Sequence, residues 1–260
     1  MRLHFLALVA FLFPAVVSSQ NLLLVEPRNE LVFTLGLHRG FFNDANYSPL
    51  HQQSVGPEFE LSYQRNTADG NRYSVGFGAT LATLSTSVDD EEKATRPVIN
   101  LHVGWQKGLA GNTPDRRLYV GVNFRSNADV TLYDGDESVT WFALHAFEGA
   151  AAGAWRVGKK HGINAEVAVP FFGLLSRPPY SGFDKFISDN SDNLFKILTR
   201  GSWTSLNNFF GIRGELGYAY QITDRWFMQA KYGLNYYTTQ RQDRTRIFNN
   251  SLSLSSSHKF

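Results

Sequence analysis

Along most of this chain, apolar and polar residues alternate one by one. In "FFGIRGELGYAYQI" the apolar residues from Phe210 to Ile222 fall on one face, while Arg213 and Glu215 fall on the other. Successive side chains of a β-strand point to opposite sides of the sheet, so this pattern predicts strands with one apolar and one polar face. The alternation returns in "RWFMQAKYGLNYY", "INLHVGWQK", "RLYVGVNFR", "FELSYQR", "YSVGFGATL", "LVFTLGLH" and "INAEVAVPFF".

The alternating segments predict about ten strands, and eight or twelve are the alternatives. Strands of soluble domains usually have about five or six residues, whereas a tilted strand needs about 9–11 to cross a bilayer. Most of the predicted strands reach that greater length. Their expected ranges are 30–38, 57–66, 71–84, 97–107, 116–125, 139–157, 162–174, 209–222, 225–238 and 246–260.

The connections between these strands are alternately short and long. The short ones are "NTADGN", "GLAGNTPD", "GKKHG" and "TDR", and the long ones span residues 39–55, 85–96, 126–138, 176–208 and 239–245. This alternation is typical of a barrel with short periplasmic turns and long extracellular loops. The predicted fold is therefore all-β, an antiparallel up-and-down transmembrane β-barrel.

The first residues have the three regions of a secretory signal peptide. Arg2 precedes an apolar run from Leu3 to Val17, and small residues follow in "SSQ". The run is shorter than the roughly 20 residues of a membrane-spanning helix, so a membrane anchor is the weaker interpretation. We expect residues 1–19 to be a cleaved signal peptide and residues 20–260 to form a single barrel domain.

Composition narrows the possible chemistry. The chain has no Cys, which excludes a disulfide framework and a thiolate metal site. The net charge of +2 is small and the basic residues are scattered, so no nucleic-acid partner is expected. No phosphate-binding or dinucleotide motif is present, and no cofactor is expected. Two acidic runs, Asp89–Glu92 and Asp134–Glu137, are interpreted as solvated loops, with divalent cations bridging lipopolysaccharide phosphates as the alternative.

A signal peptide, amphipathic strands and a last strand that ends in Phe260 resemble the outer-membrane β-barrels of Gram-negative bacteria. The resemblance implies a place in the outer membrane, in contact with outer-membrane lipids and lipopolysaccharide. It also implies that the barrel-assembly machinery recognises the last strand, through residues that share one face of it: Phe248, Leu252, Leu254 and Phe260.

The polar strand faces are expected to meet inside the barrel. A barrel of about ten strands is narrow, and its inward side chains must largely fill it. Because an unpaired charge is costly there, the interpretation is a plug of mutually paired charges, and a solute path is the alternative. The residues assigned to this network are Glu60, His102, Arg125, Glu148, Glu166, Arg213, Glu215 and Lys231.

One pair in this network depends on the length of a turn. Glu215 and Lys231 flank the turn after Ile222, and both are assigned inward. A three-residue loop, residues 223–225, places them diagonally across the hairpin, and a five-residue loop places them opposite each other.

The longest connection, residues 176–208, is the predicted functional element. It begins "SRPPYSGF", and Ser191 or Asp192 is expected to cap a short helix that Gly201 follows. The apolar side of that helix needs cover, for which the barrel mouth, the outer leaflet or a partner protein is available. We expect it to lie over the mouth as a lid formed by Leu194, Phe195, Ile197 and Leu198.

The predicted function is a structural or interaction protein that presents its loops to an extracellular or envelope protein partner. A narrow channel or transport component is the first alternative, and a lipid-modifying enzyme is the second. No nucleophile–base pair is recognisable along the sequence, because Ser257 and His258 are adjacent strand residues that point to opposite faces. No catalytic residue is assigned. Aromatic residues near strand ends predict girdles at the bilayer interfaces: Tyr73, Trp105, Tyr119, Trp226, Phe227, Tyr236 and Tyr237.

Overall fold

The structure is a computed structural model of the chain. It describes residues 28–45, 48–86, 94–133, 139–178, 189–190, 192–240 and 244–260. The predicted signal peptide, residues 1–19, lies outside the described residues, and so do both acidic runs.

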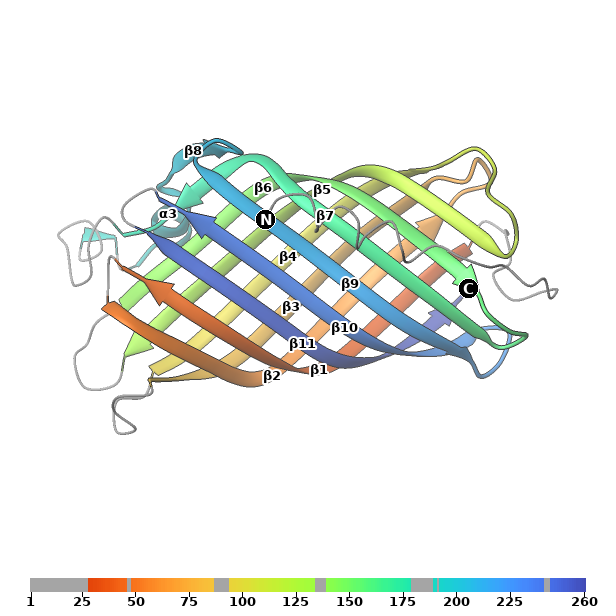
Figure 1. The fold of residues 1–260 in the computed structure, drawn as a ribbon, viewed down its shortest axis with the longest axis horizontal. Coiled ribbons are helices and arrows are strands. Elements are labelled where there is room, and N and C mark those ends of the chain that lie inside the picture. The colour runs from red at the N-terminus through yellow and green to blue at the C-terminus, as the bar shows by residue number, and fades with distance from the viewer. Residues whose placement is uncertain are drawn as a thin grey trace, which may run out of the picture.

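Ten long antiparallel strands close into a barrel within the described residues (Figure 1). Each barrel strand pairs with the next along the chain, and β1 pairs with β11 to close the ring. A short strand, β8 (Ser202–Ser205), is added along the end of β7. The barrel strands are β1 (Arg28–Asp44), β2 (Ser48–Asn66), β3 (Arg72–Thr86), β4 (Ala94–Gly108), β5 (Arg116–Tyr133), β6 (Val139–Arg156), β7 (His161–Ser176), β9 (Phe209–Gln221), β10 (Trp226–Thr239) and β11 (Thr245–Lys259).

The predicted fold class is confirmed, but several strands are longer than their sequence patterns indicated. The long loop expected at residues 39–55 is wrong, because β1 and β2 continue as a paired hairpin to Asp44 and from Ser48. Outward residues there include His51 and Gln53, which are polar and exposed. The apolar-outside pattern of a membrane-crossing strand ends before the strand itself ends, so a reading based on that pattern stops too early.

Large apolar side chains cover the outside of the barrel. On β1, Leu31, Leu35 and Leu37 are exposed on the outside. Thr34 and His38, on the opposite face of the same strand, are buried inside. Such an outward apolar face is what a strand needs to cross a bilayer. Of the aromatic residues predicted to form girdles, Tyr73, Trp105, Trp226 and Tyr236 lie on the outward faces, as a girdle requires. The prediction is wrong for Tyr119, Phe227 and Tyr237, which are buried on the inward faces.

The last residue is tied to the first strand. The Phe260 amide donates to the Asn29 carbonyl at 2.9 Å, and the Asn29 amide donates to the Phe260 carbonyl at 3.1 Å. The side chains of Leu252, Leu254 and Phe260 point outward and are exposed, and Phe248 lies 6.2 Å from Phe41 between ring centres. Phe260 therefore takes part in the closure between β11 and β1. The end of the barrel that holds Phe260 is called the turn end, and the opposite end is called the loop end.

Helix α3 (Leu194–Thr199) confirms the short helix expected in the longest connection. Its N-cap is Asn193, whose side chain accepts from the Lys196 amide at 3.0 Å, rather than Ser191 or Asp192. Gly201 follows the helix. No helix within the described residues has the length and apolar character needed to span a membrane.

Helix α3 does not lie over the barrel mouth. On β6, Phe142 and Leu144 point inward, so the intervening Trp141 and Ala143 point outward, and Ile197 of the helix packs against that outward pair. The lid expected from Leu194, Phe195, Ile197 and Leu198 is therefore corrected to a helix on the outer wall. Figure 1 shows this helix at the loop end of the barrel. The outer wall of β6 covers Ile197 with an apolar surface that the sequence pattern of β6 alone did not reveal.

Candidate functional site

Apolar side chains pack together in the barrel interior at the loop end. They come from nearly every barrel strand and form one buried cluster, here called the apolar layer: Phe42, Leu84, Ala94, Phe142, Leu144, Ala146, Leu175, Phe209, Tyr237 and Ile247. Tyr133 of β5 packs against it.

This layer spans the lumen from wall to wall. Phe142 on β6 lies 6.3 Å from Tyr237 on β10 between ring centres, although these strands are not neighbours in the sheet. Phe209 lies 5.9 Å from Tyr237 and continues the contact. An apolar constriction of this kind opposes the passage of water and hydrated solutes.

A buried ion pair stands beside the apolar layer. The Arg96 Nε donates to Asp129 Oδ1 at 2.8 Å, and a second guanidinium nitrogen contacts the other carboxylate oxygen. Arg96 also donates to the Ser54 hydroxyl at 3.0 Å and lies 5.1 Å above the Phe42 ring. Arg96 and Asp129 are both buried, so their charges are compensated by each other and by the hydrogen bond to Ser54.

A second ion pair draws the start of the longest connection across the mouth. Arg177, just after β7, donates to Asp44 at the end of β1 at 2.6 Å, and Thr245 donates to the same carboxylate at 3.2 Å. Arg177 and the following Pro178 are both buried. The loop root, rather than helix α3, therefore reaches across the mouth, and residues 179–188 lie outside the described residues.

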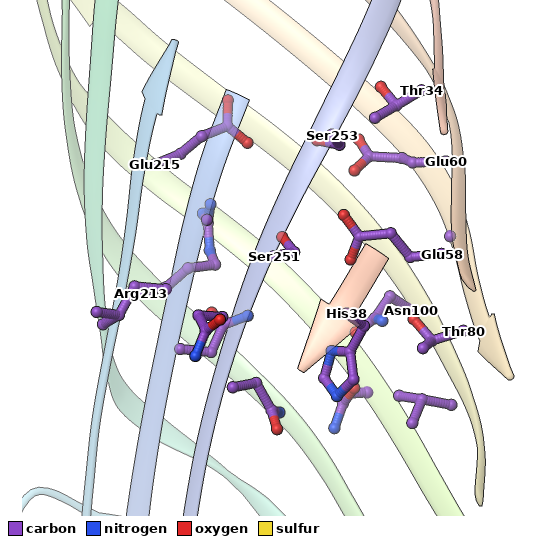
Figure 2. A pocket seen from close by; sticks show the side chains of 18 of the residues that line it. Thr34, His38, Glu58, Glu60, Thr80, Asn100, Arg213, Glu215, Ser251 and Ser253 are labelled. Carbon is purple, nitrogen blue, oxygen red and sulfur yellow. The ribbon is translucent and has the colours of Figure 1, made fainter. Parts of the chain in front are cut away.

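Between the apolar layer and the turn end lies a polar space, here called the charged chamber. It comprises two adjoining cavities of about 130 and 240 Å³ that share lining residues. The shared charged and titratable residues are Glu60, His102, Arg125, Arg213, Glu215 and Lys231. Figure 2 shows Glu58 and Glu60 pointing into this space from one side, and Arg213 and Glu215 from the other.

The structure brings most of the predicted network residues into ion pairs. Glu166 accepts from Arg213 at 2.8 Å and from Arg72 at 2.9 Å. Glu148 lies 3.5 Å from Arg213 and 3.7 Å from Arg125. Each of these carboxylates is thus shared between two arginines, which compensates charge in a confined interior.

Lys231 and Glu215 form the predicted cross-strand contact. Ile222 pairs with Trp226 around a three-residue loop, and Lys231 Nζ lies 3.4 Å from Glu215 Oε2. Glu215 stands opposite Gly233, two positions from Lys231, so the contact is diagonal, as the three-residue loop requires.

Sequence reasoning missed several charged members of the chamber, among them Glu58 and Arg72. Glu58 shares the inward face with Glu60, and Arg72 has the same parity as the inward residues of β3, so strand parity could have identified both. The His102 ring lies over Gly76 of the neighbouring strand. A Cβ at Gly76 would lie 2.3 Å from that ring, so a larger residue there would displace His102. The chamber therefore requires a glycine opposite this histidine.

A polar pair interrupts the apolar outer wall. Ser126 on β5 and His145 on β6 are cross-strand neighbours on the outward faces, and the Ser126 Oγ lies 2.8 Å from His145 Nδ1. His145 Nε2 lies 3.2 Å from the Leu198 carbonyl of α3. A carbonyl only accepts, so Nε2 carries a hydrogen, and in the neutral imidazole Nδ1 then accepts from the Ser126 hydroxyl. Beside the pair, the rings of Phe124 and Phe147 lie 5.3 Å apart.

Metal ligands are not gathered within the part of the chain that the structure describes. Across those ranges, no group of three or more His, Cys, Asp or Glu side chains is arranged to hold a metal ion.

Comparison with solved structures concerns the fold. The outer membrane protease OmpT from Escherichia coli is similar with a TM-score of 0.58 and 8% identity, over 90% of this chain and 97% of that one. The fold is that of a bacterial outer-membrane β-barrel. The translocator domain of the autotransporter NalP from Neisseria meningitidis gives a TM-score of 0.49 and 13% identity over 90% of this chain and 89% of that one. Neisserial surface protein A gives a TM-score of 0.38 and 10% identity over 88% of this chain and 97% of that one.

No protein-family model matches this barrel, and no curated protein matches it at a significant level. At 8–13% identity the structural likeness concerns the fold alone. A fold of this kind carries many unrelated activities, so any function has to be argued from the barrel's own residues.

Proposed function

We propose that this protein is an integral outer-membrane barrel that is closed to solutes and acts as a structural or interaction protein through its loop end and outer wall. It would reach that membrane by means of the signal peptide at residues 1–19. The observation that carries the proposal is the apolar layer, which fills the lumen next to the loop end. The pairing of Arg177 with Asp44 supports it by holding the loop root across the mouth.

Conductance in planar bilayers tests this proposal. We expect the wild-type barrel to show no steady open state. Phe142→Ala combined with Leu144→Ala should create one, because it removes two members of the layer that come from a single strand. The matched control is Gln229→Ala, which enlarges the charged chamber below the layer. Steady wild-type conductance comparable to that of the double variant would favour the channel alternative instead.

A second candidate function, hydrolysis of lipid esters, is favoured by the pair of Ser126 and His145 on the outer wall. The Ser126 oxygen would attack the acyl carbon while its proton passes to His145 Nδ1 and then to the departing alcohol. Water would then release the acid from the serine and restore the hydroxyl. The hydrogen bond of 2.8 Å and the outward position support this candidate.

Covalent labelling tests the second candidate. A fluorophosphonate probe should modify Ser126, and Ser126→Ala should abolish both labelling and the release of fatty acid from phospholipid micelles. Ser257→Ala is the control, since that hydroxyl is buried inside the barrel. If wild-type protein neither reacts with the probe nor releases fatty acid, this candidate is excluded and the closed-barrel proposal is unaffected.

A further inference from the structure

The segment that contains α3 and β8 lies against the outer wall and also presents large apolar side chains away from it. Phe195 is 77% exposed, Trp203 66% and Leu206 55%. These three are among the most exposed large apolar side chains of the described residues. They lie at the loop end of the barrel, beside strands β6 and β7 (Figure 1).

The helix has one side fixed to the barrel. Ile197 is buried against Trp141 and Ala143 on the outward face of β6. Phe195, two residues earlier, lies about 200° around the helix from Ile197, because each residue turns an α-helix by about 100°. Phe195 therefore points away from the barrel wall.

Polar contacts hold this segment to the wall. The Ser176 hydroxyl lies 3.2 Å from the Ile197 carbonyl and 2.8 Å from the Arg200 carbonyl, and it also accepts from Trp141 Nε1 at 3.0 Å. His145 supplies the hydrogen bond to the Leu198 carbonyl described above. The helix is too short to persist alone in water, so these contacts and Ile197 determine its position.

The exposed apolar surface continues that of the barrel. The Trp203 ring stacks on Phe172, with centres 5.2 Å apart and an angle of 7° between the ring planes. Phe172 faces outward on β7 opposite Phe147, which is also exposed. The apolar surface thus continues from Phe147 on β6 through Phe172 on β7 to Trp203 on β8. Aromatic rings at such an edge suit the interface between acyl chains and headgroups.

We infer that α3 and β8 form a membrane-seated platform, in which Phe195, Trp203 and Leu206 insert among the acyl chains of the outer leaflet. The partner is a lipid surface, because the platform adjoins the lipid-facing wall and its apolar side chains point the same way. The platform enlarges the barrel's contact with one leaflet on the side of β6 and β7.

Site-directed spin labelling tests this inference, and the absence of cysteine makes each introduced thiol unique. Phe195→Cys carries the nitroxide in the full barrel, reconstituted into phosphatidylcholine vesicles. Leu101→Cys on the outward face of β4 is the lipid control, and Asp69→Cys in a short turn is the water control. Collision rates with oxygen and with a water-soluble nickel chelate are measured at each position.

We expect the label at 195 to collide more often with oxygen than with the nickel chelate, as at 101, and the reverse at 69. A nickel-rich signal at 195 would overturn the inference. Shielding from both reagents would also overturn it, because it would indicate a protein partner or a second copy. Leu206→Cys repeats the measurement if Phe195→Cys fails to fold, and conductance reports separately on the closed lumen.

Discussion

The two halves of the lumen are built on opposite principles. At the loop end, apolar side chains pack into a layer, and its neighbouring charges, Arg96 and Asp129, are buried as a matched pair. In the charged chamber, carboxylates and cations surround open space, and several remain partly exposed, such as Glu215 at 32%. A narrow barrel can thus be closed by packing at one level and merely lined by compensated charge at the next.

The largest loss of stability is expected where a buried charge loses its partner. Asp129→Ala leaves the Arg96 guanidinium buried without its carboxylate, and losing one partner of such a pair costs about 3–5 kcal/mol. Denaturant unfolding in detergent, followed by the gel shift of the folded barrel, measures the loss. Replacing both residues, Arg96→Met with Asp129→Leu, should restore much of it. If the double variant is as unstable as the single one, the charge pair is not the cause.

Removing a packed side chain from the apolar layer should cost a similar amount of stability, and a control on the same strand can isolate it. Phe142→Ala removes a buried ring and leaves a cavity, which typically costs about 3–5 kcal/mol. Phe147→Ala on the same strand is the matched control, because Phe147 points outward and lipid can fill the vacated space. Equal losses in the same unfolding assay would mean that the layer is not tightly packed.

The charged chamber should respond more weakly. Lys231 and Glu215 contact each other at 3.4 Å beside open space, and a cross-strand charge pair is worth about 0.2–1 kcal/mol. A double-mutant cycle with Glu215→Ala and Lys231→Ala should return a coupling within that range, falling in high salt. A coupling as large as that of Arg96 and Asp129 would remove the distinction between the two halves.

The sequence predicts these two halves unequally. Strands, closure and the chamber residues follow from strict alternation, which the lipid and the polar lumen impose together. Part of the apolar layer escapes detection because Phe42 and Ala94 lie where loops were expected, at residues 39–55 and 85–96. In "WFALHA", both faces of β6 are apolar, since α3 covers the outside and the layer fills the inside. Only tertiary contacts reveal that arrangement.

The smallest effect on stability is expected at Phe260, where two variants separate the contribution of the side chain from that of the backbone. Phe260→Ala keeps both backbone hydrogen bonds to Asn29 and removes an exposed ring, so the free energy of unfolding should change by about 0.5 kcal/mol or less. Deleting Phe260 also removes the two hydrogen bonds, each worth about 1 kcal/mol.

At Phe260, the rate of assembly can be affected without a matching change in the free energy of unfolding. If the terminal ring is a recognition element for the barrel-assembly machinery, Phe260→Ala should slow folding on reconstituted machinery as much as deletion does. Spontaneous folding of the same variant in detergent micelles should keep the wild-type rate. The rate at which the heat-modifiable form appears on unboiled gels measures both. Equal slowing by Phe260→Ala with and without the machinery would assign the ring to barrel folding itself rather than to recognition, because this variant keeps both backbone bonds to Asn29.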